Sequence, residues 1–124
     1  MVLGLDFHGV IDKYPKVYGE LSRIVMMTGG QVYVITGTKV TPEFKRALES
    51  FGIVYTDILS IVDYHLSIGT LVTYDGVGNP WLDDLTWDKT KADFCEKYKV
   101  DLHIDDSKTY GKYFTGKTKY LLVQ

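Results

Sequence analysis

Short apolar runs alternate along the chain with longer segments that have helical spacing. Each apolar run is short and continuous, which is typical of a β-strand buried on both faces of a sheet. Polar residues or glycines follow most of the runs at once, so their ends are well marked. The strands predicted in this way are residues 2–5, 32–35, 53–55, 101–104 and 119–123.

Three segments between these strands have apolar residues at helical spacing. The best defined helix begins with Thr41 as its N-cap and Pro42 in its first turn, and it ends before Gly52. Its apolar stripe predicts an amphipathic helix that packs one face against the sheet. The residues of this stripe are Phe44, Ala47, Leu48 and Phe51.

The other two helices have less distinct starts. A turn-like stretch at 8–18 precedes a helix that stops at Gly29-Gly30. Asp88 is the predicted N-cap of a later helix that runs to about Tyr98. The apolar residues that define the two helical faces are Leu21, Ile24 and Val25 in the first, and Ala92, Cys95 and Tyr98 in the second.

Residues 57–88 do not follow a single period. The apolar residues between 58 and 66 fit either a helix or a strand-like run. Residues 70–74 and the Asp-Gly-Val-Gly-Asn-Pro stretch at 75–80 indicate a strand followed by a turn, as in a hairpin. A hairpin or short helix is the largest lid that this segment permits, so we expect an open site.

The alternation of strands and helices predicts the fold class. It implies right-handed crossovers and a mostly parallel sheet with helices on both faces, a three-layer Rossmann-like α/β fold in a single domain, 1–124. Ligands of such sheets bind beyond the carboxyl ends of the strands. Asp6, Thr36 and the pair Asp105-Asp106 each follow a predicted strand directly. We therefore expect these side chains to converge on one crevice.

The residues at these strand ends form four motifs in a characteristic order. The motifs are Asp6-Phe-His8-Gly9, Thr36-Gly37, a lysine at Lys89 or Lys91, and Asp105-Asp106. Their order resembles that of the haloacid dehalogenase (HAD) superfamily over nearly the whole chain, in a form with a minimal cap or none. Each motif alone is more often a turn or a helix cap. It is their joint order on alternating strands that favours a functional site.

The resemblance implies a Mg²⁺-dependent phosphohydrolase that acts on a phosphomonoester. Asp6 would be the nucleophile and would form an aspartyl-phosphate. The metal would bind the Asp6 carboxylate, the main-chain carbonyl of His8, and one or both of Asp105 and Asp106. The substrate would be a phosphorylated small molecule or a nucleic-acid end.

The resemblance also implies groups that hold the phosphoryl oxygens. These are the Thr36 hydroxyl, the Gly37 amide and a lysine that balances the negative charge. We prefer Lys89 for this role, because the earlier position on the helix lies nearer the strand ends. Lys91 is the alternative, and it shares a helical face with Phe94 and Cys95.

His8 departs from the family pattern, in which phosphatases carry a second aspartate that serves as general acid and base. Imidazole can do both, since its unperturbed pKa is about 6.5. The alternative is a slow or inactive phosphatase, that is, a binding module for a nucleotide, nucleic acid or protein partner.

A response-regulator receiver domain is disfavoured, because its acidic pair follows the first strand. His103, which alternates with apolar neighbours, is expected to fill a layer between sheet and helix.

The composition of the chain limits its possible partners and its cellular compartment. The 124 residues include 14 basic and 16 acidic ones, so no overall basic field attracts nucleic acid. A lone cysteine excludes an internal disulfide and fits a reducing compartment. The chain has no signal-peptide pattern and no membrane-spanning run, so we expect a cytoplasmic protein that does not bind membranes. Neither zinc-ligand spacing nor a phosphate-binding glycine loop occurs.

Charge is unevenly spread along the chain. Residues 57–88 contain aspartates but no lysine or arginine, whereas residues 107–124 contain lysines but no acid. The lysine-rich end, with Tyr110 and Tyr113 for stacking, would suit a polyanion such as a nucleic-acid end. Such lysines are more often a solvated face, and the acidic segment would oppose a polyanion if it overhangs the site.

Overall fold

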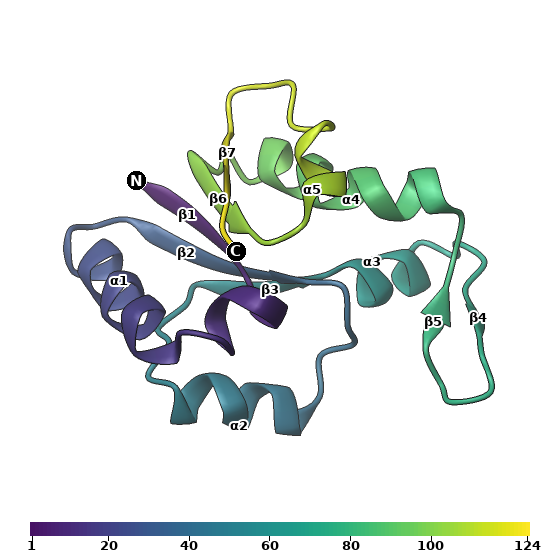
Figure 1. Ribbon diagram of the computed structural model, residues 1–124, viewed down its shortest axis with the longest axis horizontal. Helices are drawn as coiled ribbons and strands as arrows, with labels where there is room; N and C mark the ends of the chain where they lie inside the picture. Colours follow the sequence, from purple (N-terminus) through teal and green to yellow (C-terminus); the bar gives the residue numbers. More distant parts are fainter.

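The computed structural model describes all 124 residues, and its centre is a five-stranded parallel sheet (Figure 1). The strands lie in the order β3-β2-β1-β6-β7, so the N-terminal strand is in the middle. A separate antiparallel hairpin, formed by β4 and β5, extends away from the sheet. The strand bounds are β1 Val2–Asp6, β2 Gln31–Thr36, β3 Asp57–Ser60, β4 Thr73–Tyr74, β5 Pro80–Trp81, β6 Leu102–Asp105 and β7 Lys119–Leu122.

Helices cover both faces of this sheet (Figure 1). Side chains of α1 and α2 join one apolar core with β1 and β2, while side chains of α3 and α4 join a second core on the other face. The predicted class, an α/β fold with a parallel sheet between two helical layers, is confirmed. The helical bounds are η1 Phe7–Ile11, α1 Pro15–Met27, α2 Pro42–Ser50, α3 Ile61–Ser67, α4 Asp84–Lys97 and α5 Lys108–Gly111.

The central strands are apolar on both sides because each side meets a different core. In β2, Val32 and Val34 belong to the core under α1 and α2, whereas Tyr33 and Ile35 belong to the core under α4. Alternate residues of a strand point to opposite faces, so a sheet covered on both faces requires a continuous apolar run. This is why the runs at 2–5 and 32–35 were readable as strands.

The sheet order places a topological switch at the carboxyl ends of β1 and β6. The chain moves outward from β1 to β2 and β3, then crosses to β6 on the other side of β1. Crevices at such reversals are the usual ligand sites of parallel α/β sheets. Leu5 pairs with Ile104, so the next residues, Asp6 and Asp105, end adjacent strands. Strand β1 therefore lies between the strands that end at Thr36 and Asp105.

Two predicted boundaries are correct in detail. The Thr41 hydroxyl accepts a hydrogen bond from the Phe44 amide at 3.1 Å and caps α2. Gly52 has a φ of 69°, the left-handed conformation expected after a helix C-terminus. Residues 57–88 resolve into both alternatives, because 57–60 form a strand, 61–67 form a helix, and a hairpin follows.

Two predicted boundaries are wrong. The strand predicted at 53–55 lies instead at Asp57–Ser60, because pairing with β2 begins only at Asp57. Ile53 belongs to a loop, and its apolar side chain is buried in the core. Helix α4 begins at Asp84, not after Asp88, because the Asp83 carboxylate caps it by accepting from the Thr86 amide. Several aspartates in this segment could cap a helix, and Asp83 is the one that does so.

The stretch predicted as turn-like at 8–18 contains more helix than expected. Phe7–Ile11 form η1, a turn in which His8 and Gly9 have non-helical backbone angles, but α1 already begins at Pro15. Phe7, Val10 and Ile11 are buried in the core beneath it, which explains why the chain folds back on itself here. Of the predicted α1 face, Val25 is buried but Ile24 is exposed.

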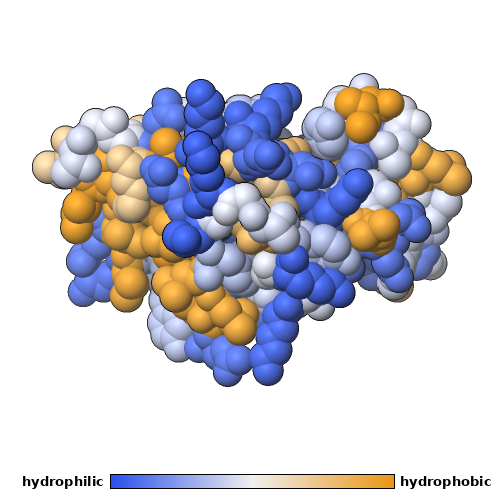
Figure 2. All heavy atoms as spheres, turned by 90° about the horizontal axis from the view of Figure 1, so that it is seen from above, coloured by the Kyte–Doolittle hydropathy of each residue, from blue (hydrophilic) through white to orange (hydrophobic).

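The hairpin is held by its own polar contacts. The Asp75 carboxylate accepts from the amides of Val77 and Asn79, each at 2.9 Å, as in an Asx turn. Apolar side chains on the hairpin and beside it lie on the surface, at the right-hand end of the view in Figure 2. None of the helices combines the length and apolar character that a membrane span requires.

Candidate active site

Three carboxylates meet at the carboxyl ends of the two central strands. Asp6 ends β1, Asp105 ends β6, and Asp106 follows directly. One oxygen from each lies within 4.8 Å of the others. Asp6 and Asp105 are buried, whereas Asp106 is exposed to the crevice. The predicted convergence of these residues at one edge of the sheet is confirmed.

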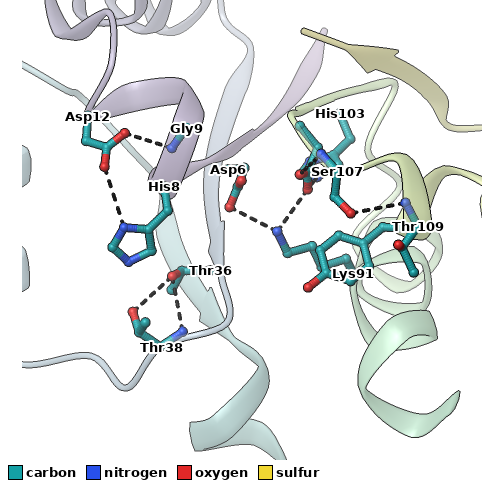
Figure 3. A network of polar contacts seen from close by, with 12 residues as sticks. Asp6, His8, Gly9, Asp12, Thr36, Thr38, Lys91, His103, Ser107 and Thr109 are labelled. Atoms are coloured by element: carbon teal, nitrogen blue, oxygen red, sulfur yellow. Dashed lines mark hydrogen bonds and ion pairs between the residues drawn. The ribbon is translucent and has the colours of Figure 1, made fainter. Parts of the chain in front are cut away.

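Lys91 is the cation of this cluster. Its Nζ donates to Asp6 Oδ1 at 2.9 Å and to Asp105 Oδ2 at 2.8 Å (Figure 3). Its side chain is only 3% exposed. Lys91 belongs to helix α4, so its two hydrogen bonds connect this helix to the ends of strands β1 and β6.

The expectation that Lys89 lies nearer the strand ends is wrong, since Lys89 is exposed. Successive residues of a helix are about 100° apart, so positions 89 and 91 point roughly 200° apart and only one can face the sheet. The sequence contained the deciding signal, because Lys91 shares its face with the buried Phe94 and Cys95. Distance from the helix start was the wrong criterion.

Burial and charge act in opposite directions on this cluster. Burial raises the pKa of Asp6 to about 7; Lys91 opposes this rise, and the Asp105 carboxylate adds to it. Burial alone would also raise the pKa of Asp105, but the His103 hydrogen bond and Lys91 hold it below its ordinary value. Burial alone would lower the pKa of Lys91, yet the two carboxylates raise it above its ordinary value. One lysine therefore faces a charged Asp105 and an Asp6 that titrates near neutrality.

His103 is a member of this network that the sequence reasoning did not place there. Its Nε2 lies 2.9 Å from Asp105 Oδ2, and its ring stacks in parallel on Phe114, with the ring centroids 5.4 Å apart. A Cβ on Gly4, its partner on β1, would lie 2.8 Å from the imidazole Nδ1. The predicted burial of His103 is confirmed. The contact with Asp105 was foreseeable, because residues two apart on a strand share a face.

Gly9 and Asp106 fit closely against each other. A Cβ at Gly9 would lie 1.9 Å from Asp106 Oδ2, and Gly9 also has a φ of 82°. The positive φ favours glycine at this position, and a side chain here would displace the Asp106 carboxylate. The Tyr120 hydroxyl donates to the Ser107 carbonyl and so holds the segment after the acidic pair. The turn after β1 and the turn after β6 therefore form one continuous floor.

His8 lies at the edge of the cluster. Its side chain is 60% exposed, and its Nδ1 is 3.5 Å from Asp12 Oδ2. Asp12 also accepts from the Gly9 amide at 2.7 Å, so it orders both the turn and the histidine. Figure 3 shows the His8 ring on the side of Thr36 and Thr38, away from Lys91. Asp12 was not predicted; its position four residues after His8 was the available signal.

Thr36 lies beneath the surface of the site. It is fully buried, and its hydroxyl is 3.0 Å from the Thr38 hydroxyl and accepts from the Thr38 amide at 3.2 Å. Gly37 and Thr38 line the cavity, and Thr36 supports them from below. Thr38 is thus a candidate for contact with a ligand that the sequence analysis did not name.

A cavity of about 450 Å³ lies above these residues. Its polar side includes Asp6, His8, Lys91 and Asp106, and Pro80, Trp87 and Tyr110 form a wall around it. Of the two tyrosines that we singled out for stacking, Tyr110 lines this cavity and Tyr113 does not. The lysines of the C-terminal stretch, Lys108, Lys112, Lys117 and Lys119, are exposed and do not line it.

Comparison with known proteins finds no family whose profile matches this chain, and no curated protein or solved structure that matches it. The fold class and the site geometry therefore stand on the structure itself. Membership of the HAD superfamily stays a prediction from the four motifs and their order.

Proposed function

We propose that this protein is a HAD-like, minimally capped Mg²⁺-dependent phosphohydrolase that cleaves a phosphomonoester through an aspartyl-phosphate on Asp6. The observation that carries this proposal is the contact of Lys91 with both Asp6 and Asp105, next to Asp106, at the switch point of a parallel sheet. Folding alone does not require three carboxylates and a buried lysine at the ends of two strands. The carboxylates could bind a divalent cation, and the lysine could bind a phosphate group.

The donor set fits magnesium. Asp6, Asp105 and Asp106 offer only carboxylate oxygens, and Mg²⁺ prefers hard oxygen ligands together with several waters. No histidine or cysteine of the cluster would favour zinc instead, because His103 is already hydrogen-bonded to Asp105. When bound, the cation neutralises phosphate oxygens and orients them for in-line attack.

In the first step, the Asp6 carboxylate attacks phosphorus and the ester P–O bond breaks. Lys91 offsets the negative charge that accumulates between the phosphoryl group and the acids. Gly37 and Thr38 line the cavity where the phosphoryl oxygens would lie. The leaving oxygen takes a proton from the His8 imidazole.

In the second step, water attacks the phosphorus of the aspartyl-phosphate and gives a proton to His8. The P–O bond to Asp6 breaks, so inorganic phosphate leaves and the carboxylate is restored. The net reaction consumes one water and yields an alcohol and phosphate. The Asp12 carboxylate, 3.5 Å from the His8 Nδ1, holds the ring at the rim of the site.

The exposed position of His8 favours one alternative, a binding module on the same scaffold. A ring that interacts with Asp12 and is largely open to water is less well placed than a buried acid and base. The two candidate functions share the metal and the phosphate site. They differ in whether His8 supports turnover.

The test is phosphate release from 4-nitrophenyl phosphate in Mg²⁺. Asp6→Asn is expected to lose activity by at least about 1,000-fold, because it removes the nucleophile. His8→Ala is expected to lose about 100- to 10,000-fold while it keeps Mg²⁺ binding, and His8→Asp is expected to retain activity. Asp84→Asn, an exposed change on α4, is the matched control and should behave as wild type.

Two results would decide against hydrolysis. If Asp6→Asn releases phosphate as fast as wild type, Asp6 is not the nucleophile. If only His8→Asp is active, the natural chain is a binding module.

A further inference from the structure

The site cavity has two sides of unlike chemistry. Asp6, Lys91 and Asp106 form the charged side, at the strand ends. Trp87 and Tyr110, with Pro80 from the hairpin, form a wall of flat or ring-shaped side chains. The proposed phosphoryl transfer uses none of Pro80, Trp87 and Tyr110, so the wall has no assigned role.

Contacts with the site hold this wall in place. The Trp87 indole donates from Nε1 to the Tyr110 hydroxyl at 2.9 Å. A Cβ on Gly37 would lie 2.7 Å from Trp87 Cζ2, so the indole edge lies directly on the backbone that lines the cavity. Lys91 Nζ lies 4.8 Å from the centroid of the Tyr110 ring. A surface fixed in this way binds a flat ligand with little loss of side-chain freedom.

The wall begins one helical turn from the lysine of the site. Trp87 precedes Lys91 by four residues on α4, so the two side chains share one face of the helix. One turn is about 5.4 Å. A phosphoryl group beside Lys91 therefore lies about one helical turn from Trp87, within reach of a leaving group attached to it.

The cavity is larger than a phosphate group requires. Its volume of about 450 Å³ corresponds to roughly fifteen water molecules at about 30 Å³ each. This volume leaves room for a leaving group beside the phosphate.

We infer that the substrate is a phosphomonoester whose leaving group carries a planar ring that stacks on Trp87, namely a nucleoside monophosphate. Nucleobases stack on aromatic side chains whatever their sequence, because every base has a π-face. The segment 57–88, which supplies Pro80 and Trp87, contains no lysine or arginine, so it opposes the further phosphates of a nucleic-acid strand. This inference rests on the proposed function, because it takes the reacting phosphate to lie at Asp6.

Binding without turnover tests the inference. We expect Asp6→Asn in Mg²⁺ to bind adenosine 5′-monophosphate about tenfold or more tightly than ribose 5-phosphate, as measured by calorimetry. The two ligands differ only in the base. A second substitution, Trp87→Leu, should weaken nucleotide binding by about tenfold and leave ribose 5-phosphate binding unchanged.

Trp81→Leu is the matched control, since Trp81 is the other tryptophan, is 57% exposed and does not line the cavity. It should change neither affinity. If Trp87→Leu does not fold, Tyr110→Phe replaces it. That variant removes the hydroxyl acceptor of the indole and should weaken nucleotide binding severalfold without affecting ribose 5-phosphate.

Equal affinity for the two ligands, or a nucleotide affinity that survives both wall substitutions, would overturn the inference. Tighter binding of a 5′-phosphorylated dinucleotide would overturn it in favour of a strand end. Failure of the proposed function gives a different result: nucleotide binds selectively, but wild type releases no phosphate. Equal release from both compounds would contradict the inference and leave the hydrolase intact.

Discussion

At the scale of single residues, the cluster depends on a charge balance that Lys91 maintains. Two acids taken from water at this distance repel each other unless a cation lies between them. Gly4 and Gly9 contribute by the side chains that they lack, because a Cβ at either position would collide with His103 or Asp106. The two glycines and Lys91 thus help to set the positions of the three carboxylates.

The stability of the protein should depend on Lys91 and not on Lys89. Lys91→Met leaves Asp6 and Asp105 buried without their cation, so we expect a loss of about 3–5 kcal/mol in the free energy of unfolding. Lys89→Met, at the exposed neighbouring position, should change it by less than about 0.5 kcal/mol. Urea unfolding at pH 7 without divalent cations measures both. Equal losses in the two variants would show that the lysine is not the cation of the buried pair.

At the scale of elements, α3 and α4 are joined by a buried histidine far from the carboxylates. His65 Nε2 lies 2.8 Å from Thr90 Oγ1, and Nδ1 lies 3.0 Å from Thr70 Oγ1. The Thr90 hydroxyl donates to the Thr86 carbonyl, so it accepts from Nε2 of His65. Burial lowers the pKa of His65, against a smaller opposing effect of Asp93.

This arrangement predicts a loss of stability in mild acid. The unfolded chain takes up a proton at His65 near pH 6.5, before the folded chain does, so stability is present above this pH and falls as pH decreases towards the folded pKa. For one group the slope is at most about 1.4 kcal/mol per pH unit. His65→Gln should be less stable at pH 7.5 but lose less between pH 7.5 and 5.5, as measured by urea unfolding. Parallel losses in the two proteins would rule out His65 as the titrating group.

The start of α4 is the element boundary with the largest effect on the site. Capping by Asp83 adds a turn before the predicted start at Asp88, and this turn carries Trp87. The cavity therefore has an aromatic wall that a helix starting at Asp88 would have lacked.

At the scale of the whole molecule, the strand order brings together residues that are far apart in the chain. Asp6 lies 85 residues before Lys91 in the sequence, and Asp105 lies 14 residues after it. Both carboxylates nevertheless accept a hydrogen bond from the Lys91 amine. Parallel crossovers collect the carboxyl ends of all central strands at one edge. The site is thus a property of the topology.

A divalent cation should stabilise the folded protein through this site. Mg²⁺ at 100 times its dissociation constant would add about 2.7 kcal/mol, because it binds the folded state only. We expect millimolar Mg²⁺ to raise the melting temperature of wild type and of Asp84→Asn, measured by calorimetry. The double variant Asp105→Ala, Asp106→Ala should not respond. An unchanged wild-type melting curve would argue strongly against a metal at the three acids.

The sequence by itself determined the fold class and the convergence of Asp6 with Asp105 and Asp106. These follow from apolar runs and from the rule that parallel strands end at one edge, so local pattern and topology agree. Only the tertiary structure decided which lysine reaches the acids, how His103 contacts Asp105, and that Trp87 and Tyr110 form a wall. Each of these depends on the rotation of a helix or on packing between distant segments, and a one- or two-residue shift in a helix start changes the direction of every side chain on it.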